Sequence, residues 1–561
     1  ASHEISVTVK QGKLLGHREA TVFEGRLYFA FYRVPYAQAP IGSLRFKNPQ
    51  PAKKWKYTRD AAIEYNGACA QSHIVHKSGV YGYEDCLYIN IYTPHIPKPE
   101  DTQLKPVVLW IHGFAFASCF SHIHKPDFLI NQEIIVVTVA HRIGVFGFLK
   151  LNDYDSNANM GLKDIVMALK WVRANIKYFG GDKNKITVMG NGSGASFISL
   201  LFMTEARTLF SKAILQSGSI FSPSIFQGDP ASERNRLFQD LKRKHLQVNN
   251  APTKDIIESA HSIYIRNNLE MENLQRPIVP FTPMVEADTS DSLLLQTPAK
   301  FFETIKDNKT YFNKPILIGF NSQESIPEVM PFIHNPYHLK TFINFFKFLV
   351  PFSDGGNYDT TSTTYKKIAN IIKDRYFKDT EKSLDNLLKY ASDLLKFPIV
   401  KFVKTYLRVS SGNMFMYKFD YRGTLNAVKA TSLAEKKIKV SGVASSDEIC
   451  YLLRCEPFWE GYAQMKKEEV NKDKKLIQEI SSLWGNFIKY GDPNPYCEST
   501  PHGDYNVTWL PTNTNLDNVL LIRKYFELRS SRNDNAMYNF WLYLYENYYK
   551  EKALVMKHDE L

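Results

Sequence analysis

The chain has 561 residues, of which 44% are hydrophobic and 23% are charged, a composition typical of a globular protein and not of a disordered one. Its formal net charge is +13, but the 70 basic residues are scattered among 57 acidic ones without a long basic block, which argues against a nucleic-acid partner. No run of 18 or more apolar residues occurs, so the sequence predicts no transmembrane segment.

Short runs of β-branched and other apolar residues alternate with helical patterns along the chain. Residues 161–179 carry apolar side chains at helical spacing, and Gly180-Gly181 ends that helix. Strands that alternate with helices predict an α/β fold with a large, mainly parallel central sheet and helices on both faces. The predicted buried strands cover residues 107–111, 134–139, 186–189, 213–216, 316–320 and 414–419.

The other segments are mostly helical in pattern. Residues 225–310 and 340–410 are rich in aromatic residues, and we predict that they form a helical cap and a side lobe. A helix is expected over 464–475, with its lysines on a solvated face. Residues 537–549 are helical in pattern and contain Trp541 and five tyrosines. We predict that this helix packs in the core, with an exposed partner-binding face as the alternative.

The ends of the chain and its cysteines indicate a compartment. Without an internal repeat or linker, residues 1–557 are predicted to form a single domain, followed by His558-Asp559-Glu560-Leu561. A C-terminal HDEL is a signal that the endoplasmic reticulum retrieval receptor binds. The chain starts without a charged and apolar leader, as expected of a mature chain whose signal peptide has been removed.

The six cysteines form no C-x-x-C pair and no zinc pattern with histidine, so we predict no metal and no cofactor.

The oxidising lumen expected from this tail favours disulfides and glycans. The sequons beginning at Asn308 and Asn506 are the predicted glycosylation sites. Asn191-Gly192-Ser193 also matches the pattern, but it lies in a predicted strand-to-helix turn and is expected to be too buried for modification.

Several motifs together resemble the type-B carboxylesterase family, which includes the cholinesterases and insect esterases. They are Arg33-Val34-Pro35-Tyr36-Ala37 with Leu44-Arg45-Phe46, Glu84-Asp85-Cys86-Leu87-Tyr88-Ile89-Asn90-Ile91, Gly161-Leu162-Lys163-Asp164 and Phe179-Gly180-Gly181-Asp182. The resemblance runs from about residue 5 to 545 and implies an α/β-hydrolase fold. It also implies a Cys69–Cys86 disulfide and the ion pairs Arg45–Glu84 and Arg142–Asp164. The remaining cysteines, at 119, 450, 455 and 497, have no assigned pairing.

The nucleophile of such a hydrolase is a serine at the tip of a tight strand-to-helix turn, with a glycine two residues away on either side. The corresponding sequence is Gly190-Asn191-Gly192-Ser193-Gly194, so the nucleophile position is Gly192. Glycine has no side chain with which to attack a carbonyl. Ser193 stands one residue late, where the family uses the backbone N–H as an oxyanion donor.

The base and the oxyanion hole also depart from the family pattern. The histidine segment is similar to residues 442–452, with Ser445 at the histidine position, and a neutral hydroxyl cannot act as a base near pH 7. The carboxylate is retained as Glu324, which we expect to be held by hydrogen bonds, with Ser217 as one donor. In the oxyanion run His112-Gly113-Phe114-Ala115, Phe114 replaces a glycine while Ala115 is within the family's range.

These departures predict a catalytically inactive member, for which three interpretations stay open. The first is a protein that binds a small hydrophobic ligand in the former gorge, lined by Phe114, Phe116, Gly192 and Tyr451. The second is a luminal escort, storage or interaction protein for a client protein, similar to the neuroligins or the C-terminal domain of thyroglobulin. The third is a residual ester hydrolase that uses Ser193 as nucleophile. The sequence leaves the oligomeric state open, a homo-oligomer included.

Overall fold

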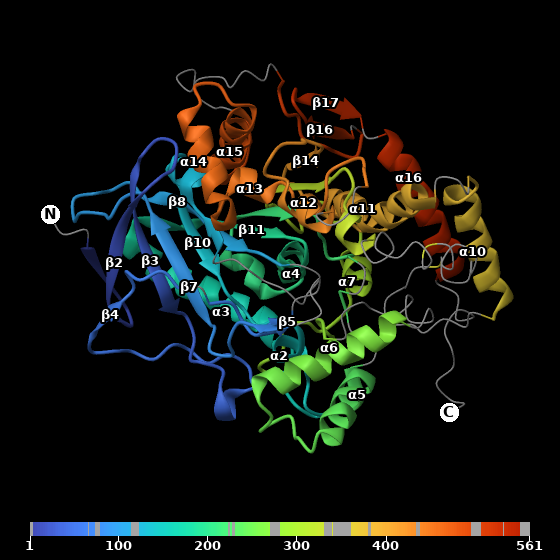
Figure 1. The fold of residues 1–561 in the computed structure, drawn as a ribbon, viewed down its shortest axis with the longest axis horizontal. Coiled ribbons are helices and arrows are strands. Elements are labelled where there is room, and N and C mark those ends of the chain that lie inside the picture. Colours follow the sequence, from blue (N-terminus) through green and yellow to red (C-terminus); the bar gives the residue numbers. More distant parts are fainter. Residues whose placement is uncertain are drawn as a thin grey trace.

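The computed structural model is built around one large twisted sheet (Figure 1). It describes residues 4–549 except 66, 73–78, 114–122, 223–224, 227–229, 270–280, 330–338, 340–349, 351–360, 380–382, 434–437, 495–506, 516 and 531. The sheet has thirteen strands within the described residues, in the order β1-β2-β3-β7-β10-β8-β11-β12-β13-β14-β16-β17, with β4 paired to β2. The edge strands of that order are β1 (Glu4–Val9) and β17 (Glu527–Ser530).

The central strands are parallel and the flanking ones are antiparallel. The parallel block contains β10 (Ile135–Val139), β8 (Lys105–Ile111), β11 (Gly181–Asn191), β12 (Lys212–Gln216), β13 (Ile316–Asn321), β14 (Met414–Phe419) and β16 (Asn518–Ile522). The antiparallel strands at the amino-terminal side are β2 (Gly12–Ala20), β3 (Leu27–Pro35) and β7 (Tyr88–Thr93), and β4 (Thr58–Asp60) runs parallel to β2.

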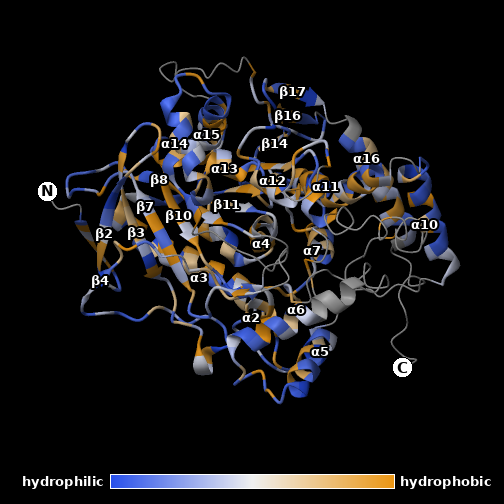
Figure 2. Cartoon of the chain, viewed as in Figure 1, coloured by the Kyte–Doolittle hydropathy of each residue, from blue (hydrophilic) through white to orange (hydrophobic). Residues whose placement is uncertain are grey.

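Both faces of the parallel block are covered, because successive side chains of a strand point to opposite faces. Along β8, Val107, Leu109 and Ile111 join one core cluster with helices α3 (Met160–Asn175) and α4 (Ser193–Leu201). Val108 and Trp110 join a second cluster with α13 (Ile449–Leu452) and α15 (Lys472–Tyr490). Figure 2 shows the hydrophobic residues concentrated in these strands and the hydrophilic ones on outer helices such as α10 and α14.

All six predicted strands are present, and the helix predicted over 161–179 is α3 followed by a short 3-10 turn, Ile176–Phe179. The helix predicted over 464–475 is wrong. Helix α14 (Trp459–Lys467) ends there, and α15 begins after Asn471, whose side chain accepts a hydrogen bond from the Lys474 N–H at 3.0 Å. An asparagine that caps a new helix ends the apparent continuity of the pattern.

Helices occupy both segments expected to form lobes (Figure 1). In the first segment α5 (Pro230–Arg243) and α6 (Thr253–Leu269) pack against each other, whereas α7 (Pro298–Ile305) lies apart from them and packs through Phe301 against Phe312; the second segment contains α10 (Thr363–Tyr376) and α11 (Ser383–Val409), which pack together. The C-terminal helix α16 (Arg532–Leu544) packs against α11 and continues into a π-helical turn, Tyr545–Tyr549. Trp541 is fully buried, so the core-packing prediction for this helix is confirmed.

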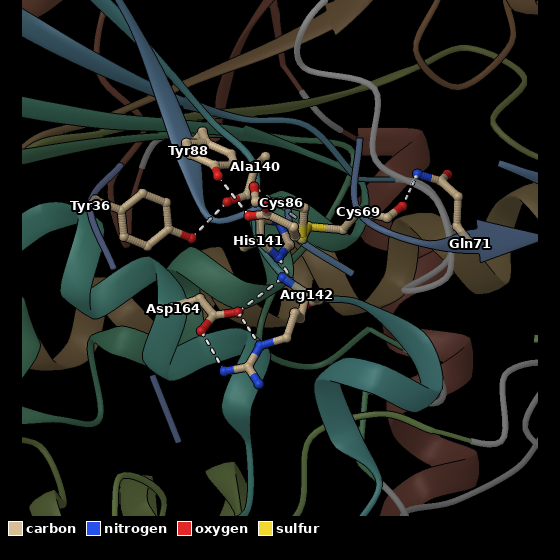
Figure 3. Close-up of a disulfide and its surroundings, with 10 residues drawn as sticks. Tyr36, Cys69, Gln71, Cys86, Tyr88, Ala140, His141, Arg142 and Asp164 are labelled. Atoms are coloured by element: carbon tan, nitrogen blue, oxygen red, sulfur yellow. Dashed lines mark hydrogen bonds and ion pairs between the residues drawn. A yellow bond between two sulfur atoms is a disulfide. The ribbon is translucent and has the colours of Figure 1, made fainter. Parts of the chain in front are cut away.

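The predicted covalent link between Cys69 and Cys86 is present, with an S–S distance of 2.04 Å (Figure 3). A second disulfide, which the sequence left open, joins Cys450 to Cys455. The predicted ion pairs are also present: Arg45 Nε lies 2.7 Å from Glu84, and the buried Arg142 lies 2.8 Å from Asp164. Within the described residues, no helix has the length and apolarity needed to cross a membrane.

Candidate functional site

A tight turn joins strand β11 to helix α4 and places Gly192 at its tip. Gly192 has φ 55° and ψ −121°, a backbone conformation that only glycine adopts without strain. Its N–H donates to the Gln216 carbonyl at 2.8 Å, and its carbonyl accepts from the Ser196 N–H at 3.1 Å. The turn therefore has the shape that would present a nucleophile, but the residue at its tip has no side chain.

The glycines on either side of the tip are required by close packing. A Cβ on Gly190 would lie 2.6 Å from the Gly194 carbonyl carbon, and one on Gly194 would lie 2.1 Å from the Ile111 carbonyl oxygen. A Cβ on Gly192 itself would lie 2.7 Å from the carbonyl oxygen of Gly113. A side chain at the tip would therefore have to displace the Gly113 carbonyl.

Ser193, the first residue of α4, is 4% exposed, and its hydroxyl has no hydrogen-bond partner among the described residues. The hydroxyl lies against Gly113, because a Cβ on that glycine would approach it to 2.2 Å. A serine needs a neighbouring proton acceptor to become a nucleophile. No described residue accepts a hydrogen bond from the Ser193 hydroxyl.

Glu324 lies just beyond the end of β13 and is almost fully buried. Its carboxylate accepts hydrogen bonds from the Ser217 hydroxyl at 2.6 Å and the Asn321 N–H at 2.7 Å, and it also bonds to the side chain of Ser445. The expected contact with Ser217 is confirmed. Burial, with a smaller contribution from the nearby Glu448, raises the pKa of Glu324 to about 7.

Ser445 therefore stands beside Glu324, where an orienting carboxylate would hold a histidine. The adjacent Ser446 has φ 69° and donates its hydroxyl to the Asn191 side chain at 2.7 Å. Asn191 is the residue that precedes Gly192. The structure thus brings the turn, Glu324 and Ser445 together at the carboxyl ends of the parallel strands.

A second buried carboxylate at these strand ends was missed. Glu448 accepts from the side-chain amides of Asn191 at 2.9 Å, Gln216 at 3.0 Å and Asn321 at 2.6 Å. Each amide ends one of the neighbouring parallel strands β11, β12 and β13. This repeat of amides at strand ends was a readable signal for a shared acceptor. Burial raises the pKa of Glu448, although these amides oppose the shift.

Tyr451 does not line a cavity, so that part of the predicted pocket is wrong. Its side chain is 0% exposed and belongs to the core cluster that contains α15. Its hydroxyl donates to the Asn426 side chain at 2.6 Å and accepts from the Leu425 N–H at 3.1 Å. The helical turn α13, which follows the Ser445 segment, directs this ring into the core.

The other predicted site residues divide into those the structure describes and those it does not. Asn308 is exposed, and its side-chain oxygen accepts from the Thr310 hydroxyl at 2.9 Å. Asn191 is buried, as expected for the unmodified sequon. The residues that lie outside the described part of the chain are Phe114, Ala115, Phe116, Cys119, Cys497, Asn506, His558, Asp559, Glu560 and Leu561.

Comparison with known proteins points to the same family as the sequence motifs. Residues 3–541 match the carboxylesterase family. A juvenile hormone esterase of Tribolium castaneum is 29% identical over 519 residues, which cover 88% of this chain and 85% of that protein. Venom carboxylesterase-6 of Apis mellifera is 31% identical over 408 residues, covering 71% and 72%. The crystal structure of a juvenile hormone esterase from Manduca sexta superposes with a TM-score of 0.80 over 97% of this chain and 100% of that one, at 23% identity, and supports the α/β-hydrolase fold.

Proposed function

This chain belongs to the carboxylesterase family, and we propose that it is a non-catalytic member that binds a small hydrophobic ligand in the gorge where an esterase would hold its substrate. The observation that carries the proposal is Gly192 at the tip of the strand-to-helix turn, with φ 55° and no side chain. Loss of a triad nucleophile typically lowers the rate by about a millionfold.

The surroundings of Glu324 support the same proposal. Ser445 replaces the base beside it, and a hydroxyl has no proton-accepting pKa near neutrality. Because Glu324 already accepts from Ser217 and Asn321, it is satisfied without an imidazole. The retained turn and buried network then serve to keep the gorge in shape.

The runner-up is an ester hydrolase that uses Ser193. The relatives of this chain are named as esterases. The Ser193 hydroxyl is buried without a hydrogen-bond partner among the described residues. Against it stands the lack of a described proton acceptor near that hydroxyl. A luminal protein that holds a client protein is the third candidate, and it is distinguished by the test below.

We also propose that the protein works in the secretory pathway and is retrieved to the endoplasmic reticulum lumen. Two disulfides are the kind of link that persists in an oxidising compartment. The tetrapeptide His558-Asp559-Glu560-Leu561 supplies a retrieval signal. Exposed Asn308 and the sequon at Asn506 would carry glycans.

The test combines activity with recovery of a bound molecule. Protein purified from secreting cells is expected to hydrolyse short-chain aryl esters no faster than a heat-inactivated sample, and to remain unlabelled by an organophosphate. Labelling that disappears in Ser193→Ala would favour the runner-up.

Organic extraction followed by mass spectrometry is expected to release a hydrophobic compound from the wild type. Ser445→Phe, which projects a ring from a half-buried position of the site, should abolish its retention. The matched control is Ser292→Phe, at a half-buried position of a turn outside the site. A co-purifying protein with no extractable compound would instead support the client-holding candidate.

A further inference from the structure

The fold gathers lysines that are far apart in the sequence. Strands β1 and β2 form a hairpin, and Lys10 lies in its turn. Strand β4 runs parallel to β2, beginning where Thr58 pairs with Lys13, so the segment that leads into β4 lies at the same end as the hairpin turn. The sequence of that segment is Lys53-Lys54-Trp55-Lys56-Tyr57. Strands β2 and β4 lie at one end of the molecule (Figure 1, left).

Trp55 fastens this segment to the hairpin. Its backbone N–H donates to the Gln11 carbonyl at 2.9 Å, and its indole Nε1–H donates to the Lys13 carbonyl at 3.0 Å. The ring also covers Gly12, because a Cβ on that glycine would lie 2.4 Å from the indole Nε1. Two segments that are distant in sequence therefore form one surface.

This surface, which we call the lysine patch, carries five exposed lysines: Lys10, Lys13, Lys53, Lys54 and Lys56. None of them forms an ion pair within 4.0 Å in the described part of the chain. Residues 5–18 and 25–59 contain no aspartate or glutamate, so neither segment supplies an acid that could neutralise the lysines.

The element packed beside the hairpin does not neutralise the lysines either. The end of α3 meets the hairpin through a hydrogen bond from the Lys10 N–H to the Asn175 side chain at 3.0 Å. Residues 165–181, which include that end, contain no acidic residue. The first acid after the segment is Asp60, at the end of β4, and one of its carboxylate oxygens accepts from the Ala62 N–H at 3.0 Å. The lysine patch is therefore a region of uncompensated positive charge.

One aromatic ring stands among these lysines, and it favours one kind of anionic partner. Tyr57 is 62% exposed. Tyrosine is enriched at the level of lipid headgroups, because its ring is apolar and its hydroxyl is polar. Lysine is a compact point charge, whereas arginine is the residue suited to bidentate recognition of a single phosphate or sulfate group. Lysines around an exposed tyrosine therefore fit an extended anionic surface with an apolar layer beneath it.

We propose that the lysine patch docks the protein on a membrane surface that carries acidic phospholipids. The five ammonium groups would lie among the anionic headgroups, and the Tyr57 ring would enter the interfacial layer. Each lysine near such a surface strengthens binding about fivefold. Salt weakens the attraction, because the Debye length falls from about 10 Å at 0.1 M to about 3 Å at 1 M ionic strength. The proposal does not depend on the ligand proposed for the gorge.

Sedimentation of the full chain with lipid vesicles tests the proposal. Phosphatidylcholine vesicles with about 30% phosphatidylserine should bind the chain at about 0.1 M salt and release it at about 1 M salt. Vesicles of phosphatidylcholine alone should leave it in the supernatant. Combining Lys53→Gln, Lys54→Gln and Lys56→Gln should weaken binding about a hundredfold, because three of the charged contacts are lost.

The matched control combines Lys466→Gln, Lys467→Gln and Lys472→Gln. It removes the same charge from exposed positions of α14 and α15, where Glu468 and Glu469 lie between the lysines. It should weaken binding by at most about fivefold. Because the lysines of both triple variants are exposed, both proteins should keep the stability of the wild type in urea unfolding.

Three results would overturn the assignment. They are equal vesicle binding by the wild type and the triple variant at 53, 54 and 56, equal losses in the two triple variants, and the same binding to phosphatidylcholine alone as to the acidic vesicles. Capture on immobilised heparin without binding to the acidic vesicles would also overturn it, and would assign the lysine patch to a sulfated polysaccharide.

Discussion

Gly192 owes its place to backbone geometry, and this gives a prediction at the scale of one residue. Gly192→Ala should lower the free energy of unfolding by at least about 1–3 kcal/mol, because a side chain at φ 55° and ψ −121° is strained. Its Cβ would also lie 2.7 Å from the Gly113 carbonyl oxygen. Urea unfolding measures the change.

The control for this prediction is Gly461→Ala. Gly461 lies in helix α14 with nothing within 4 Å of its Cβ position, so alanine should stabilise the protein by about 0.5–1 kcal/mol. Equal effects of the two substitutions would contradict the role given to the turn.

The close approach of the Gly113 carbonyl oxygen to a side chain at position 192 also predicts that Gly192→Ser combined with Ser445→His restores weak esterase activity at best.

Glu324 predicts how stability depends on pH. Its pKa is about 7 in the folded protein and about 4.5 in an unfolded chain, so the folded state holds the proton more tightly. Its contribution to stability is therefore complete below about pH 4.5, falls as the pH rises, and is lost above about pH 7. The full change is about 3 kcal/mol, since one pKa unit corresponds to about 1.4 kcal/mol.

Glu324→Gln removes this titration while keeping an oxygen for Ser217 and Asn321. Relative to the wild type, the variant should gain up to about 3 kcal/mol between pH 4.5 and 7.5, measured by urea unfolding at several pH values. Glu303→Gln, at an exposed position of α7, is the control that should show no such gain. A difference that does not vary with pH would contradict the prediction.

At the scale of the element, the start of α15 depends on Asn471. This side chain caps the helix through the Lys474 N–H at 3.0 Å, and α15 places Leu476, Ile480 and Trp484 in the core. Asn471→Ala should cost about 1 kcal/mol of unfolding free energy in chemical denaturation. Asn471→Ser keeps a capping oxygen and should recover most of it, whereas an equal loss in both variants would mean that the cap is not the cause.

The elements also show what the sequence could predict. Six of the seven parallel strands were predicted, because they contain continuous apolar runs buried on both faces, and such runs stand out in the sequence; the seventh, β16, was missed. The antiparallel strand β2 was not predicted, because it is only partly buried and mixes polar with apolar residues. Strand β3 was also missed, although it is a mostly buried run of apolar and aromatic residues. The break between α14 and α15 was missed because lysines continue across the capping Asn471.

The sequence likewise predicted only part of the candidate site. Glu324 and Ser445 were found because each lies in a local motif, and Ser217 followed from the fold that the motifs imply. The Glu448 network was missed because its contacts are long-range, with Asn191 lying 257 residues away along the chain. Tyr451 was assigned wrongly because proximity in sequence to Ser445 does not fix the direction of a ring after a helical turn.

At the scale of the whole molecule, the proposed retrieval signal gives a prediction about where the protein is found. Deletion of residues 558–561 should release the protein into the medium of secreting cells, because the receptor would no longer bind it. Immunoblotting of cells and medium measures the distribution. A variant with Asp559→Ala and Glu560→Ala tests the same signal without shortening the chain, and unchanged retention in both would contradict the retrieval proposal.

The end of the sheet at β17 has a consequence for behaviour at high concentration. This strand has only four residues, and Glu527 and Arg529 on it form an ion pair at 2.8 Å. Short edges with charged side chains are poor templates for a strand from another chain. At high protein concentration, molecules therefore collide more often at this edge, but strands from other molecules are not expected to add to the sheet there.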